Sequence, residues 1–302
     1  MRVRWASIKT ILYNVLIFFV IANVLYWLIP ALGTFMRAGK TLATIARPIS
    51  PSYSDAEAAW VRTYQVEVHR VGSVYRSHVG WRRDPFKGER INVSGPYLQR
   101  RTLNDNASGQ AKAYFFGGST MWGEGSDDAG TIPSHFAAIT GVRSENFGES
   151  AYTAHQGLSL LILLLQAGHR PDLVVFYEGV NDVINKCRTE LTPESHGLEQ
   201  KFERVLSRST IADSFTYYLT PIMAVAENIK REATRAVEGE EHDCHRNPAK
   251  AEAIADLLLR DWEFAKHLVE WHGGKFVGIL QPVAYLSRTR LDQASGSVYS
   301  KS

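Results

Sequence analysis

Cysteine is scarce in this sequence, which has Cys187 and Cys244 as its two thiols among 302 residues. Neither stands in a CxxC or other close metal-ligand spacing. His242, Cys244 and His245 lie near one another, but no second ligand pair stands at zinc-site spacing, so no metal site is expected. In an oxidising compartment the two thiols could form a disulfide, and otherwise they would remain separate. The sequence leaves both possibilities open.

Runs of like charge are also missing. The 34 Lys and Arg residues and the 31 Asp and Glu residues give a net charge of +3 and are spread along the chain. Proteins that bind nucleic acid gather basic residues on one face or in one run, so no nucleic-acid partner is expected. There is no GxxxxGK[ST] phosphate loop, and we expect no cofactor. The apolar fraction of 45% and the charged fraction of 22% are ordinary for a globular domain.

An uncharged apolar stretch runs from Ile11 to Ile29. A helix needs roughly 17 to 25 such residues to cross a bilayer, and Tyr26 and Trp27 suit the aromatic belt at a membrane surface. We therefore expect residues 1–30 to be an uncleaved, single-pass membrane anchor. A cleaved signal peptide is the alternative, because residues 31–33 (ALG) resemble a small-residue cleavage site.

The sequence indicates the orientation of this anchor in the membrane only weakly, because basic residues flank it on both sides. The short basic leader before it favours an inward amino terminus. On that basis we expect the rest of the chain on the extracytoplasmic side, periplasmic or extracellular.

The sequence pattern of the remaining chain changes near residue 110. Residues 31–110 contain scattered Pro, Gly and Arg, with short periodic stretches such as Asp55 to His69, and are interpreted as a linker and an N-terminal subdomain. In residues 111–302, short apolar runs alternate with segments of helical length, which is typical of repeated βα units. The predicted strands are Ala113–Phe116, Val142–Phe147, Leu173–Tyr177 and Phe276–Leu280. The predicted helices are Thr131–Thr140, Ala154–Ala167 and Ala249–Trp271.

These elements predict an α/β fold, a three-layer α/β/α sandwich around a mainly parallel sheet. In the last helix, apolar residues recur near the 3.6-residue period and predict one buried stripe. The stripe consists of Ile254, Leu257, Leu258, Ala265, Leu268 and Val269. The interval from Asn185 to Arg246 is longer than a simple crossover, and helices are expected near Leu198–Leu206 and Ile222–Val237. Because insertions at the carboxyl ends of parallel strands surround the ligand crevice, this interval is the candidate for substrate selection.

Polar residues follow three of the predicted strands directly. The first strand ends in GGST, which places Ser119 after two glycines, the second leads into NFGESAY, and the third leads into GVND. The carboxyl ends of parallel strands meet at one edge of a sheet, so Ser119 and Asn181 are expected to converge there. An Asn amide and turn N–H groups can stabilise the oxyanion of a tetrahedral intermediate. A plain Gly-Ser turn and a structural Asn-Asp turn are the alternatives.

Over residues 111 to 282 the chain resembles the SGNH, or GDSL-like, hydrolase family, which has a flavodoxin-like fold. GGST resembles the first block and implies Ser119 as the nucleophile, and GVND resembles the third block and implies Asn181 as an oxyanion donor. NFGESAY resembles the second block, with Gly148 at its first glycine. Ala151 stands where the family commonly has a second glycine whose N–H serves the oxyanion, and an alanine still offers that amide.

The family's last block, Asp-x-x-His, supplies the catalytic base, and it does not occur in this sequence. Either the sequence stops before that block, which we favour, or the base has been lost. His155, His242 and His245 are the histidines considered as replacements, although no spacing supports any of them.

The resemblance implies a serine ester hydrolase that acts on a small-molecule or carbohydrate ester, with a carbohydrate O-acetyl ester as the first substrate hypothesis. The alternative is a catalytically silent SGNH-like binding protein that assists export or assembly of a cell-surface polymer. An Asp-x-x-His further along the reading frame would separate the two.

Overall fold

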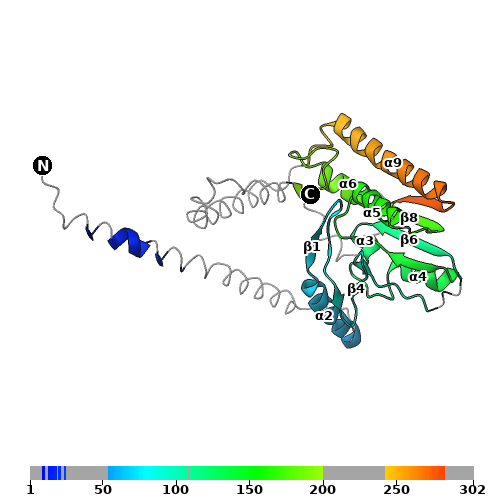
Figure 1. Cartoon of the computed structure of the whole chain (residues 1–302), viewed down its shortest axis with the longest axis horizontal. Coiled ribbons are helices and arrows are strands. Elements are labelled where there is room, and N and C mark those ends of the chain that lie inside the picture. The colour runs from blue at the N-terminus through cyan, green and yellow to red at the C-terminus, as the bar shows by residue number, and fades with distance from the viewer. Residues whose placement is uncertain are drawn as a thin grey trace. The chain divides into compact units, whose positions relative to one another are not determined.

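The computed structural model describes residues 54–199, apart from 106 and 108, residues 242–282, and a few positions between 9 and 24. The chain divides into two compact units. One contains Met1–Ala58 and Gln200–Glu240, and the other contains Ala59–Glu199 and Glu241–Ser302. The second unit holds the sheet and the candidate site (Figure 1).

Two sequence predictions fall largely on residues outside this description. Of the expected membrane anchor Ile11–Ile29, only residues 13–18, 20, 21 and 24 are described, and they are helical. Within the described residues, no helix is both long enough and apolar enough to cross a membrane. Of the helices expected near Leu198–Leu206 and Ile222–Val237, all but residues 198 and 199 lie outside the description.

A seven-stranded mixed sheet forms the centre of the second unit, in the order β3-β4-β5-β7-β6-β8-β9. The long strands β7, β6, β8 and β9 are parallel, and they confirm the four predicted strands. They cover Arg143–Asn146, Lys112–Gly117, Leu173–Glu178 and Lys275–Leu280. Three short antiparallel strands extend this sheet beyond β7, namely β3 Phe86–Lys87, β4 Asn92–Ser94 and β5 Gln99–Arg100. The prediction of a mainly parallel sheet is therefore right for the long strands and missed this antiparallel edge.

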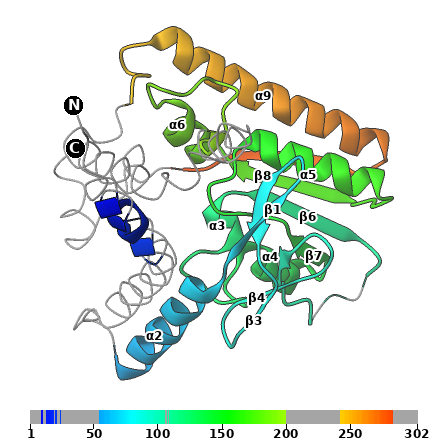
Figure 2. The same ribbon diagram turned by 60° about the vertical axis from the view of Figure 1, so that its left-hand side comes forward.

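Helices cover both faces of the parallel strands. Phe115 and Val175 on one face pack with Met121 of α3 (Ser119–Trp122) and Phe136 of α4 (Ile132–Thr140). On the other face lie α5 (Ala154–Gln166) and α9 (Pro248–Trp271), which run side by side in both views (Figures 1 and 2). The short α6 (Val180–Lys186) follows β8. The three predicted helices are thus confirmed to within a residue or two at each end.

The predicted stripe on α9 is confirmed at Ile254, Leu258, Ala265 and Val269, which are buried. Leu257 and Leu268 are only partly buried. The same buried face also contains a carboxylate, Asp261.

The segment before the parallel sheet packs against the helix that begins at Ser119. It consists of α2 (Asp55–Arg70), the hairpin of β1 (Ser73–Arg76) and β2 (Gly80–Arg83), and β3 to β5. Its apolar cluster includes Ile91, Val93 and Leu98 together with Trp122, the last residue of α3. The guanidinium of Arg100 is buried and lies 4.3 Å from the Trp122 ring. Trp122 therefore belongs both to the core of this segment and to α3, the helix that begins at Ser119.

The two cysteines form a disulfide. Cys187 and Cys244 are 57 residues apart in sequence, and their Cα atoms are 5.2 Å apart. The bond joins the end of α6 to the loop that leads into α9. Closing a loop of this length stabilises a fold by about 4 kcal/mol in the chain-entropy account.

Candidate active site

Ser119 is the first residue of α3, just after the end of β6. The two positions before it, Gly117 and Gly118, both require glycine. A Cβ on Gly117 would lie 2.4 Å from the carbonyl oxygen of Tyr177, and one on Gly118 would lie 2.3 Å from Nδ2 of Asn181. Real Cβ atoms do not approach other atoms so closely, so any larger residue would push β6 away from β8 or displace the Asn181 amide. The residue directly before Ser119 therefore lies against the Asn181 amide.

The loop from Gly148 to Tyr152, the 148–152 loop, is joined to the end of β6. The N–H of Glu149 donates to the Gly117 carbonyl at 2.9 Å. A Cβ on Gly148 would lie 2.5 Å from the backbone nitrogen of Trp122, so this residue packs directly on α3. The first and second motif segments, predicted to converge from their positions after parallel strands, are brought together by these contacts.

Ala151 has a φ of +65°, in the left-handed region. A side chain there costs roughly 1–2 kcal/mol because Cβ crowds the neighbouring carbonyl, and this explains why the resembling family commonly has glycine at this position. Its backbone N–H donates to no described acceptor and the residue is exposed, so the amide remains available to a ligand. The replacement of glycine by alanine keeps the donor but requires the loop to be held by other contacts.

Asn181 connects the third motif segment to the same loop. Its Nδ2 donates to the Tyr152 carbonyl at 2.8 Å, which orients the amide and leaves its second hydrogen free to point elsewhere. The next residue, Asp182, is buried, accepts from the Ala154 N–H at 3.2 Å, and accepts from Lys186 Nζ at 2.9 Å. Asn181 and Asp182 together tie α6 to the end of the 148–152 loop and to the start of α5.

No described residue forms a hydrogen bond with Oγ of Ser119, so no base is identified there. Nδ1 of His155 lies 3.2 Å from Oδ1 of Asp261, and Nε2 of His242 lies 3.0 Å from the Ile184 carbonyl. His245 is exposed. Among the described contacts, none of the three histidines considered from sequence is hydrogen-bonded to Ser119.

The residue after β9 and the first turn of α3 are joined by a hydrogen bond. Nε2 of Gln281 donates to Oγ1 of Thr120 at 2.8 Å, and Thr120 is the residue next to Ser119. In the sequence, Gln281 and Pro282 directly follow the last predicted strand, Phe276–Leu280. The residues after Pro282 lie outside the description.

Sequence reasoning missed a group of buried charged side chains beneath the site. Glu178, the last residue of β8, is 2% exposed, and burial raises the pKa of its carboxyl well above the usual range, with the Asp182 carboxylate adding to the effect. A Cβ on Gly157 of α5 would lie 2.7 Å from Oε1 of Glu178, so the helix closes directly over this carboxyl. Glu178 ends an apolar strand, and that position gave no signal that its side chain turns inward.

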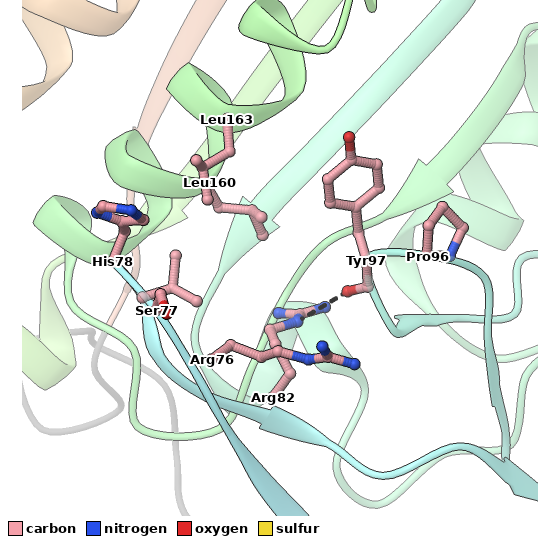
Figure 3. A pocket seen from close by; sticks show the side chains of 9 residues that line it. Arg76, Ser77, His78, Arg82, Pro96, Tyr97, Leu160 and Leu163 are labelled. Carbon is pink, nitrogen blue, oxygen red and sulfur yellow. Dashed lines mark hydrogen bonds between the residues drawn. The ribbon is translucent and has the colours of Figure 1, made fainter.

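A cavity of about 290 Å³ lies beside the β1–β2 hairpin and α5 (Figure 3). The residues that line it are Arg76, Ser77, His78, Val79, Arg82, Pro96, Tyr97, Leu160 and Leu163. Ser119, Gly148, Ala151 and Asn181 do not line it. We therefore do not interpret this cavity as the catalytic cleft.

Comparison with known proteins gives neither a matching family model nor a matching curated protein. Among solved structures, the chain is similar to AlinE4, an SGNH-hydrolase family esterase, at 15% identity over 63% of this chain and 90% of that one, with a TM-score of 0.31. It is also similar to a lipolytic protein of the G-D-S-L family from Desulfitobacterium hafniense DCB-2, at 20% identity and a TM-score of 0.24. That match covers 34% of this chain and 57% of the other.

At these identities and TM-scores the likeness carries no argument about this chain. What the structure shows is that the three motif segments meet at one edge of the sheet, the arrangement expected from the sequence.

Proposed function

We propose that this protein is a serine ester hydrolase of the SGNH type. Ser119 Oγ attacks the carbonyl carbon of an acyl ester, and the oxyanion is stabilised by the N–H groups of Ser119 and Ala151 and by the Asn181 amide. The observation that supports this most is the hydrogen bond from Asn181 Nδ2 to the Tyr152 carbonyl. It joins the Asn181 amide to the same loop that contains the Ala151 N–H, so two of the three proposed oxyanion donors are held together.

The proposed reaction proceeds in two steps. In the first, the Ser119 hydroxyl proton passes to a base, an acyl–Oγ bond forms, and the alcohol leaves with a proton. In the second, water attacks the acyl group, the acid is released, and Ser119 regains its proton. The family resemblance implies that the base belongs to an Asp-x-x-His segment. Without a base, oxyanion stabilisation and binding leave a residual acceleration of about 10³ to 10⁴ over water.

For the substrate we propose a carbohydrate O-acetyl ester. Its support is the resemblance of a membrane-tethered SGNH domain to enzymes that act on acetyl groups of exported glycans.

A second candidate is a silent binding protein of a cell-surface polymer. It is favoured by one observation, which is that no described histidine contacts Ser119.

We also propose that the domain lies on the extracytoplasmic side of a membrane, joined to it through Ile11–Ile29. Two observations support this. The Cys187–Cys244 disulfide is typical of oxidising compartments, and the described side chains at Val15, Leu16 and Ile17 are apolar and exposed. Protease added to spheroplasts should digest the domain and leave a short membrane-bound stub. Complete protection until the membrane is permeabilised would reverse the proposed topology.

The test of the activity is hydrolysis of p-nitrophenyl acetate and of an acetylated xylo-oligosaccharide by the protein carrying its full reading frame. Ser119→Ala should reduce turnover by several orders of magnitude while the fold is retained. Ser73→Ala, an exposed serine on β1, serves as the matched control and should keep the parent rate. Equal rates for Ser119→Ala and its parent would reject the esterase assignment. Binding of the oligosaccharide without any hydrolysis would favour the silent binding protein.

A further inference from the structure

We propose that strand β2 (Gly80–Arg83) is a positioning element of the active site, and that Arg83 is its principal positioning residue. Its role is to hold the 148–152 loop so that the Ala151 N–H faces the oxyanion. The inference deepens the proposed function and rests on it. It concerns a segment that lies outside residues 111–282, the range over which the chain resembles the SGNH family.

Trp81 makes the first set of contacts between β2 and the loop. Its indole Nε1 donates to the Ser150 carbonyl at 3.1 Å. In return, the Tyr152 hydroxyl donates to the Trp81 carbonyl, and the two rings pack edge to face with centroids 5.3 Å apart. The indole bond holds the peptide group that contains the Ala151 N–H, and the other two contacts hold the side chain of the residue after Ala151.

Arg82 holds the start of the loop. Its side chain is 2% exposed, and Nη1 donates to the carbonyls of Phe147 and Gly148 at 3.0 and 3.2 Å. The other N–H groups donate to the carbonyls of Tyr97 and Leu98, and the bond to Tyr97 is drawn in Figure 3. A guanidinium whose donors are shared among four carbonyls joins the loop rigidly to the neighbouring strand segment.

Arg83 joins the loop to the helix of the nucleophile. Its Nη2 donates to Ser150 Oγ at 2.7 Å and to Glu124 Oε1 at 3.1 Å, and its backbone N–H donates to Glu149 Oε2 at 2.8 Å. Its guanidinium also lies 4.9 Å from the Trp122 ring, at the end of the helix that begins at Ser119. One side chain therefore spans the nucleophile's helix and the residue directly before Ala151.

The need for this support follows from the backbone of Ala151. Alanine in the left-handed region is strained because its Cβ crowds the neighbouring carbonyl, so a loop without other contacts would relax and rotate the amide away. Hydrogen bonds from charged groups are stronger than those between neutral groups, and the bonds from Arg82 and Arg83 keep Ala151 in this conformation. Loss of a single oxyanion donor typically costs about 10² to 10³ in kcat.

The experiment compares three variants of the protein carrying its full reading frame, with p-nitrophenyl acetate as the probe. Arg83→Gln should lower kcat about tenfold or more, with KM within about twofold, because the donor acts mainly in the transition state. Arg83→Lys should recover only part of the loss, since an ammonium keeps the charge but lacks the fork and the stacking. Arg76→Gln, in the same hairpin and without a bond to the loop, should match the parent.

A positioning role predicts one further result that a purely structural role does not. Glycine adopts the left-handed region without strain, so Ala151→Gly should restore a substantial part of the kcat lost in Arg83→Gln. Ala151→Gly alone, made in the parent, should raise kcat by a smaller factor than it does in Arg83→Gln. An Arg83→Gln enzyme with parental kcat, or one that loses kcat without any rescue by Ala151→Gly, would overturn the proposal.

Amide hydrogen exchange separates this proposal from the proposed function. Exchange at Ser150 and Tyr152, whose N–H groups donate to Glu149, should become faster in Arg83→Gln and stay unchanged in Arg76→Gln. If the parent hydrolyses no ester, the proposed function fails, whereas the exchange result still decides whether β2 holds the loop. Unchanged exchange in Arg83→Gln would reject the positioning role whatever the activity.

Discussion

Nδ1 of His155, near the start of α5, lies 3.2 Å from Oδ1 of Asp261 in the middle of α9. Asp261 is almost fully buried and His155 is partly exposed. The hydrogen bond to Asp261 raises the pKa of the His155 imidazole, burial opposes the shift, and the Asp261 charge adds to it. This pair has the chemistry of a base with an orienting carboxylate, yet it is directed at the packing of two helices.

The first prediction concerns this pair. Asp261→Asn should lower the pKa of His155 toward its ordinary value, as measured by NMR titration of the imidazole protons. A raised folded-state pKa stabilises the fold fully below the unfolded pKa, about 6.5, and the contribution is lost as pH rises through the folded value. Asp261→Asn should therefore lose more stability at pH 5.5 than at pH 8.5. An equal loss at both pH values would show that the pair does not couple to folding.

The second prediction is that His155 is not the base of Ser119. His155→Ala should leave ester hydrolysis by the 302-residue chain at the feeble rate of the parent, because a serine hydroxyl needs a base within about 2.6 to 3.2 Å and no described histidine contacts it. If the reading frame continues into an Asp-x-x-His, a protein extended through it should turn over much faster. The two lengths are purified and assayed side by side. Vigorous hydrolysis by the short chain that disappears in His155→Ala would show the assignment to be wrong.

The parts of the fold that could be predicted are those with a long, regular signal. The apolar runs of β6, β8 and β9 and the periodic stretch of α9 each gave an element close to its observed bounds. Strands β3 to β5 contain only two or three residues each, which is too short for any alternation to be visible. Asp261 stands within an otherwise apolar stripe, and only its contact with His155, 106 residues away, explains it.

The candidate site also contains parts that the sequence pattern indicates and parts that it does not. The convergence of the segments that carry Ser119, Gly148, Ala151 and Asn181 could be predicted because each segment follows a strand whose end lies at one sheet edge, and the catalytic roles of these residues stay a prediction. The contribution of β2 could not, since its contacts with the 148–152 loop join residues more than sixty positions apart. An arginine in a short strand gives no sign of which carbonyls it will reach.

The third prediction concerns the buried carboxyl of Glu178. Its folded-state pKa is raised, so its contribution to stability is fully present below the unfolded pKa and is lost as pH rises through the folded value. Glu178→Gln removes this titration while keeping the shape. Urea unfolding of both proteins from pH 5 to pH 9 should show the parent losing stability relative to the variant as pH rises. A constant difference between the two across that range would contradict the raised pKa.

The fourth prediction concerns the disulfide. Replacing Cys187 and Cys244 together by serine should lower the free energy of unfolding by about 4 kcal/mol and the melting temperature by about 10 °C. A reducing agent should produce a similar shift in the parent and none in the double variant. An unchanged melting temperature of the parent under reduction would show that the bond is not formed or does not contribute.

The last prediction tests the close approach between the second motif segment and the nucleophile's helix. Gly148→Ala would place a methyl group 2.5 Å from the backbone nitrogen of Trp122 and 2.8 Å from the Met121 carbonyl carbon. Both are backbone atoms, so the 148–152 loop or α3 must move, and overpacking of this kind costs about 1–3 kcal/mol. Because the same movement separates Ser119 from the Ala151 amide, ester hydrolysis should fall further than the loss of folded protein accounts for. Gly109→Ala is the matched control, since its Cβ would meet only the backbone nitrogen of Ala111, at 3.9 Å. The measurements are urea unfolding and kcat for p-nitrophenyl acetate in the protein carrying its full reading frame. Parental stability and turnover in Gly148→Ala would show that the loop does not pack on α3 as described.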